Sequence, residues 1–205
     1  MGVFAAKLTR TATASAVFLL VLVAVYALHS RFLHVDVVFY AALLDVVVAA
    51  ALVAPWLWRG RFFQPLQSFE KLQLLLIWLL AGYALAISVP TVIDRSLSFY
   101  LLEKLAQRGG AIRQDAFAGI FVDEYLPEHR LVDVRLTEQL QSGTIVIDAG
   151  CVRLTPWGRR LARFSLEFRR RFLPRRRLLM GEYSDDLTDP FRQGGAAPDY
   201  RCDAP

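Results

Sequence analysis

The chain has 205 residues, 55% of them hydrophobic, and a formal net charge of +5. Its mean hydropathy of +0.36 excludes an ordinary soluble protein of this size, unless the apolar residues are concentrated in a few segments. They are concentrated in three runs within the first 93 residues, at about 11–28, 37–57 and 72–93. The sequence therefore predicts an integral membrane protein.

Each run is long enough to form a transmembrane helix, because a hydrocarbon core about 30 Å thick needs roughly 20 helical residues. The loops are short, so neighbouring spans should be antiparallel. Lys7 and Arg10 precede the first run and would also suit a secretory signal, but no small-x-small cleavage site follows Leu28 and two further runs come directly after it. We therefore expect residues 1–93 to be a three-helix transmembrane anchor.

Two histidines and an acid, His29, His34 and Asp36, crowd the first loop. Three possible ligands without a defined spacing are weak grounds for a metal site, and we interpret them as polar side chains that reach the headgroups. The spacing of the only two cysteines, Cys151 and Cys202, suggests neither a disulfide framework nor a zinc site. The sequence thus predicts no metal and no cofactor.

Asp45 stands near the middle of the second run, where an acid costs about 2.5–3.5 kcal/mol. An acid at that depth is a candidate functional residue. The alternative is a protonated carboxyl that bonds a neighbour such as Tyr83 or Ser88, or a partner subunit. We favour this structural role, because no lysine or arginine lies at matching depth.

Pro90, Asp94, Arg95 and Ser96 mark the exit of the third run, and residues 94–178 form the next predicted domain. Either Asp94 or Ser96 can cap the following helix, and we favour capping as the role of Asp94. Arg95 could bind a lipid phosphate or help to set the exit angle of the chain, and both roles stay open.

Three short amphipathic helices follow, with apolar residues recurring every three or four positions. They cover about 97–108, 114–125 and 128–141. A pair of glycines ends the first helix, Pro127 separates the second from the third, and a Ser-Gly pair ends the third.

A β-hairpin and a final helix complete this domain. The β-rich runs 144–148 and 151–154 flank a two-residue turn. Thr155 then caps a helix with Pro156 at its first position, where a missing N–H costs nothing. This helix continues through Phe172.

The stretch 142–162 reads S-G-T-I-V-I-D-A-G-C-V-R-L-T-P-W-G-R-R-L-A. It resembles the wing region of the winged helix-turn-helix superfamily, in which a recognition helix ends in glycine, a β-hairpin follows, and a threonine-capped helix closes the unit. The resemblance covers about residues 95–173 and implies a fold without implying a function. The predicted fold class is thus membrane α-helical, with three transmembrane helices, plus a small α+β winged-helix-like soluble domain.

In a DNA-binding relative the helix 128–141 would enter the major groove, with Arg130, Arg135 and Gln139 as possible base contacts. Residues 115–141, however, carry six acids against two arginines, a net charge of −4. An acidic helix loses the counterion-release contribution that supplies most of the non-specific affinity for DNA. We therefore favour a solvated or partner-facing helix, and nucleic acid is a disfavoured partner.

Positive charge is concentrated on the last helix and just beyond it, interleaved with phenylalanines. This basic segment can bind anionic lipid headgroups, an acidic partner protein or nucleic acid, and tethering next to the bilayer favours lipid or a membrane-bound partner. An acidic, largely irregular tail expected at 179–205 could instead fold back on it. The predicted lipid- or partner-binding residues are Arg159, Arg160, Arg163, Arg169, Arg170, Arg171, Arg175, Arg176 and Arg177.

The leading hypothesis is a non-enzymatic, membrane-anchored interaction or regulatory module, an accessory subunit of a membrane complex that handles lipids or envelope glycans. Membrane lipids and other membrane protein subunits are its expected partners. One alternative is a membrane-tethered winged-helix transcription regulator. Another is a small membrane enzyme or transporter component that uses Asp45 or the Asp94/Arg95 pair, although the sequence has no Ser/His/Asp set, phosphate loop or paired-carboxylate signature.

The expected location is the inner (cytoplasmic) membrane of a bacterium. Basic residues near the spans barely distinguish the two orientations, with five on the side of the N-terminus and four on the other side. We expect the C-terminal domain in the cytoplasm, because a winged-helix fold and binding to an anionic leaflet both suit that side. The five are Lys7, Arg10, Arg59, Arg61 and Lys71, and the four are Arg31, Arg95, Lys104 and Arg108.

Overall fold

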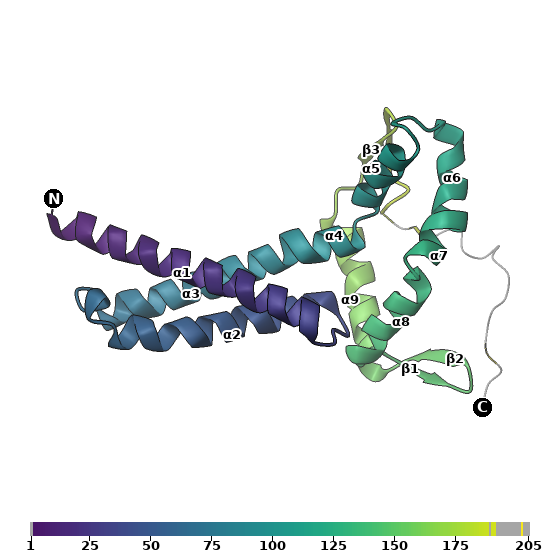
Figure 1. Ribbon diagram of the computed structural model, residues 1–205. Helices are drawn as coiled ribbons and strands as arrows, with labels where there is room; N and C mark the ends of the chain where they lie inside the picture. The colour runs from purple at the N-terminus through teal and green to yellow at the C-terminus, as the bar shows by residue number, and fades with distance from the viewer. Residues whose placement is uncertain (1, 189, 192–201, 203–205) are drawn as a thin grey trace. The chain divides into compact units, whose positions relative to one another are not determined.

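The computed structural model describes residues 2–188, 190–191 and 202 (Figure 1). The chain divides into two compact units, Met1–Val122 and Asp123–Pro205. Within the described ranges, three helical segments are long and apolar enough to cross a membrane, Gly2–Phe32, Val38–Arg59 and Ser68–Arg95. The prediction of three membrane-spanning helices is therefore confirmed, and the first and third segments extend beyond the predicted spans at both ends.

The first unit is built on three helices that lie side by side, with α2 antiparallel to the other two (Figure 1): α1 (Gly2–Phe32), α2 (Val38–Arg59) and α3 (Ser68–Ala86). The rings of Phe18 and Trp78 stack with centroids 4.9 Å apart, and the indole N–H donates to Ser15 Oγ at 3.0 Å. These contacts join α1 to α3 through the middle of the buried core. The short 3₁₀ helix η1 (Arg61–Phe63) lies in the connection between α2 and α3, and its Phe63 is fully buried.

The third span continues from α3 through a π-helical turn, η2 (Ile87–Thr91), into α4 (Val92–Arg95). Pro90 accounts for this turn, because proline lacks an N–H and its ring clashes with the carbonyl four residues earlier. Ser96 then caps α5 (Leu97–Gln107), since its Oγ accepts the N–H of Phe99 at 3.3 Å. The prediction that Asp94 is the cap is wrong, because Asp94 lies inside α4.

The second predicted helix is a series of short helical turns. They are η3 (Gln114–Ala116), α6 (Phe117–Gly119), the π-helix η4 (Ile120–Tyr125) and α7 (Leu126–Glu128). Pro127 therefore lies within a turn instead of ending the helix. The helical conformation is interrupted at Arg130, whose left-handed backbone has a φ of 44°, and α8 (Leu131–Gln141) begins directly after it.

In the second unit, strand β1 (Ile145–Asp148) pairs antiparallel with β2 (Cys151–Leu154), as the sequence predicts. Both turn residues, Ala149 and Gly150, have positive φ angles of 48° and 77°, which is typical of a tight hairpin turn. Helix α9 (Pro156–Phe172) also has the predicted bounds. A second hairpin of β3 (Arg177–Leu179) and β4 (Glu182–Ser184) was not expected, since β4 lies in the part predicted to be irregular.

Hydrogen bonds hold the end of α8, the first hairpin and the start of α9 together. Thr155 Oγ1 accepts the N–H of Gly158 at 3.0 Å and lies 2.8 Å from the carbonyl oxygen of Gly143, to which it donates. Thr144 Oγ1 donates to the Gln139 carbonyl at 3.0 Å. Gly158 is required here, because a Cβ at this position would collide with the Thr144 carbonyl. The winged-helix fold itself stays a prediction.

Candidate functional site

Helix α9 exposes a continuous apolar stripe. Its large apolar residues recur at intervals of three or four, so they share one face of the helix. All of them are between 42% and 71% exposed, and the rings of Phe164, Phe168 and Phe172 follow one another with centroids 5.9 and 5.2 Å apart. The apolar stripe consists of Trp157, Leu161, Phe164, Phe168 and Phe172.

Helix α9 also carries six arginines, but not all of them are available for the same task. Arg160 lies over the ring of Trp157, 5.5 Å from its centroid, and so flanks the stripe. Arg159 donates to the Leu154 carbonyl at 2.8 Å, and Arg171 pairs with Glu167 at 3.0 Å. With six arginines and one acid, α9 has a net charge of +5.

The other three predicted arginines follow α9 instead of extending it. Arg177 begins strand β3, and the carbonyl of Arg175 accepts a hydrogen bond from Thr188 Oγ1 at 2.9 Å. The nine arginines therefore belong to two structural elements and the link between them. The acidic tail that could fold back on these arginines includes Asp189, which lies outside the described residues.

Asp45 pairs with His29. Its Oδ1 lies 2.6 Å from Nδ1 of the imidazole, and the two side chains are 3% and 13% exposed. The prediction that Tyr83 or Ser88 is the partner of Asp45 is therefore wrong. His29 lies within α1 and not in the loop, so the short connection to α2 brings the last turn of one helix beside the first turns of the next. The shortness of this loop is the sequence feature from which the contact between His29 and Asp45 could have been predicted.

A second polar pair lies at the opposite end of the same three helices. Lys7 Nζ and Glu70 Oε1 are 2.7 Å apart, which places the start of α1 beside the start of α3. Glu70 also accepts the N–H of Gln67 at 2.8 Å, which completes a capping box. Arg10 lies over the Phe62 ring at 5.5 Å. The basic residues predicted on the N-terminal side thus gather at one end of the unit.

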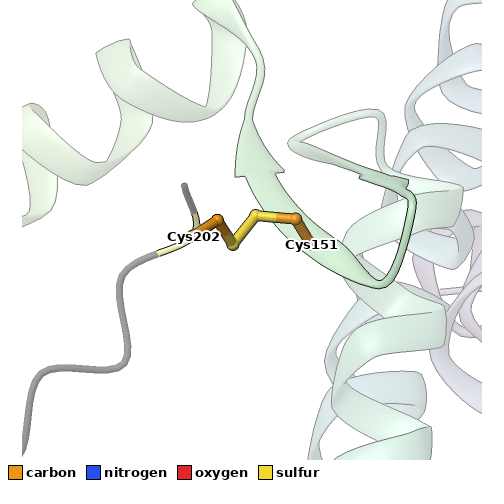
Figure 2. The surroundings of a disulfide bond; sticks show 2 residues. All are labelled: Cys151 and Cys202. Carbon is orange, nitrogen blue, oxygen red and sulfur yellow. A yellow bond between two sulfur atoms is a disulfide. The ribbon is translucent and has the colours of Figure 1, made fainter. Parts of the chain in front are cut away.

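Cys151 and Cys202 form a disulfide, with their Cα atoms 6.1 Å apart across 51 positions in sequence (Figure 2). The interpretation that the spacing of these cysteines suggests no disulfide framework therefore missed this bond. Cys151 begins strand β2, so the bond ties the first hairpin to a residue three positions before Pro205. Sequence spacing does not reveal such proximity when the partners are far apart along the chain.

The residues proposed for DNA contact are held by neighbours. Arg130 binds Asp133 at 2.8 Å, Arg135 binds Glu138 at 3.0 Å, and Gln139 Oε1 accepts from Thr144 Oγ1 at 2.5 Å. Both arginines are thus partly neutralised by acids of their own helix.

At the junction, Arg95 Nε lies 3.7 Å from Asp94 Oδ2. Asp94 also borders an apolar cavity of about 550 Å³ formed by α1, α2 and the third span, with Tyr26 as another polar group on its wall. In the part of the chain that the structure describes, no group of three histidine, cysteine or acidic residues comes close enough to hold a metal.

No family model, curated protein or solved structure matches the chain. Of the features above, the apolar stripe of α9, the disulfide and the His29–Asp45 pair are the three that local packing alone does not explain.

Proposed function

We propose that the chain is a non-enzymatic, membrane-anchored module, an accessory subunit of a membrane complex, whose C-terminal unit rests on the lipid surface through α9. The exposed apolar stripe, flanked by arginines, is the observation that supports this function. Five large apolar side chains would be costly in water, and they suit the boundary between headgroups and acyl chains. The arginines would meet the phosphates.

Charge favours lipid over a neutral surface. Each basic residue near an anionic bilayer contributes about 1 kcal/mol, and α9 carries a net charge of +5. The chain leaves its third span at Arg95, so the second unit is tethered within reach of the bilayer. DNA is a weaker candidate, because Arg130 and Arg135 already pair with acids on α8.

The disulfide supports an orientation opposite to the one favoured by the sequence, so the anionic lipid that α9 would bind has to lie in the non-cytoplasmic leaflet. Disulfides persist in oxidising compartments and are rare in the cytosol. We therefore place the C-terminal unit outside the cytoplasm, which puts the side with five basic residues near the spans inside and the side with four outside, a difference too small to add support. This orientation also removes DNA as a ligand.

Hydrogen–deuterium exchange of the full chain in nanodiscs tests the lipid contact. We expect the α9 amides to exchange more slowly in nanodiscs with phosphatidylglycerol than in nanodiscs of phosphatidylcholine alone. Phe164→Glu should remove this protection, because it places a carboxylate in the apolar stripe. Ala162→Glu adds the same charge at an exposed position off the stripe and should retain it. Equal exchange in both lipids, or equal effects of the two variants, would contradict the proposal.

A reporter fused to the C-terminus tests the orientation. We expect alkaline phosphatase, which requires an oxidising compartment, to be active in this fusion, and green fluorescent protein to be dark. Cys151 and Cys202 should react with maleimide only after reduction. A fluorescent fusion together with two reactive thiols in untreated cells would place the unit in the cytoplasm.

A further inference from the structure

The His29–Asp45 pair lines a cavity of about 420 Å³ on the flank of α1 and α2. Nδ1 of the imidazole bonds Asp45, which leaves Nε2 as the second ring nitrogen, and no other residue that the structure describes hydrogen-bonds it. The carboxyl is 2% exposed, and its Oδ2 likewise lacks a partner among the described residues. The remaining wall is apolar and consists of Val25, Leu28, Phe32, Leu33, Leu44 and Val48.

The tautomer of His29 decides what Nε2 offers to the cavity. If the Asp45 carboxyl donates to Nδ1, or if its carboxylate accepts from an imidazolium, Nε2 carries a hydrogen and can donate. If the carboxylate accepts from a neutral ring, Nε2 can only accept. A carbonyl oxygen as ligand requires one of the first two forms.

The position of the pair and the wall of its cavity limit what can accept a hydrogen bond from Nε2. Asp45 follows Val38, the first residue of α2, by seven positions, which is about 10 Å along a helix axis. His29 lies three positions before the end of α1, so the pair lies near one end of the two candidate spans, and the apolar wall of the cavity favours an acceptor carried by an apolar molecule. Several cavity walls, including Phe32 and Leu44, are exposed on the surface that acyl chains would cover.

We propose that this cavity binds an apolar molecule through a carbonyl oxygen, which accepts a hydrogen bond from His29 Nε2. Asp45 is a positioning residue that acts through the imidazole. A cavity of about 420 Å³ is within the size range of ligand pockets. The ester carbonyl of a diacyl lipid and the ring carbonyl of a prenylated quinone share this chemistry. The site is separate from α9 and does not depend on the function proposed for it.

Nitrogen NMR of the full chain in detergent reads the site directly. The protein has only three histidines, His29, His34 and His129, so ring-labelled histidine gives a simple spectrum. We expect Nε2 of His29 to be protonated at neutral pH and to shift saturably with either dioctanoylglycerol or decylubiquinone, while the other two rings stay unchanged. The probe that acts identifies the source of the carbonyl. No saturable shift with either probe would overturn the proposal.

Variants separate binding from structure, with binding of the tritiated probe as the readout. The double variant His29→Phe/Asp45→Leu should stay folded, because it replaces the pair with apolar groups, and should lose saturable binding. Leu44→Trp fills the cavity, leaves the pair intact and should weaken binding at least about tenfold, because the indole occupies volume that the ligand would take. His34→Gln, at an exposed position, is the control and should bind normally. Unchanged binding in both cavity variants would overturn the site.

Asp45→Asn tests the positioning role. The asparagine amide can donate to Nδ1 and so keep the hydrogen on Nε2, which predicts binding close to that of the unmodified protein. A loss as large as that of the double variant, with Nε2 still protonated by NMR, would show that Asp45 does not act through His29.

Discussion

Two polar pairs join the same three helices, and they differ mainly in burial. Lys7 and Glu70 are 2.7 Å apart with side chains 29% and 34% exposed, whereas His29 and Asp45 are 2.6 Å apart with side chains 13% and 3% exposed. Exposed pairs contribute little to stability, because water competes for both charges. A buried pair is costly to form and still more costly to break, because the remaining group has no partner. Similar distances thus predict very different responses to substitution.

The largest expected effect comes from breaking the buried pair. His29→Phe keeps an aromatic ring but leaves Asp45 without its partner, and it should destabilise the protein by about 3–5 kcal/mol. Adding Asp45→Leu should restore most of this loss, so the two substitutions are not additive. Thermal unfolding in detergent, followed by circular dichroism, measures both. A double variant less stable than His29→Phe would show that Asp45 stabilises the fold even without its histidine partner.

A substitution in the apolar contact between α2 and α3 should have an intermediate effect on stability. It serves as a reference for the two polar pairs, because no charge is involved. Gly82 lies against Val46 so closely that a Cβ would collide with its methyl groups. Gly82→Val should therefore cost about 1–3 kcal/mol through overpacking. Gly2→Ala is the control, since nothing lies within 4 Å of the added carbon. Equal melting temperatures for both variants would mean that α2 and α3 can move apart at Gly82 without a loss of stability.

The sequence predicted best where the signal is local. The three spans, the first hairpin and α9 follow from hydropathy, turn residues and the Thr155-Pro156 cap, all of which act within a few residues. It failed where the partners are distant or the backbone takes an unusual turn. Hydropathy does not specify that Cys202 reaches Cys151, and the left-handed Arg130 moved the start of α8 three positions from where it was expected.

In the candidate site, too, local features were predicted and features that depend on distant contacts were not. The arginines and phenylalanines of α9 were visible in sequence, because helical spacing alone places the aromatic rings on one face. Their exposure was not visible, since it depends on what the rest of the unit leaves uncovered. The position of Asp45 within the second apolar run marked it as a candidate residue. Its partner, His29, was expected in the loop, because the sequence does not fix the end of α1 to within one turn.

The smallest effect is expected from the exposed pair. Lys7→Gln removes the ion pair with Glu70 but leaves the capping bond from the Gln67 N–H to the same carboxylate in place. The melting temperature should therefore change by no more than the scatter between replicates, and it should not depend on salt beyond that scatter. Glu70→Gln is the matched variant, because its amide oxygen can still accept the capping bond. If Lys7→Gln lowered the melting temperature as much as His29→Phe, exposure would not be the property that separates the two pairs, and the start of α1 would be held more tightly than its solvent contact implies.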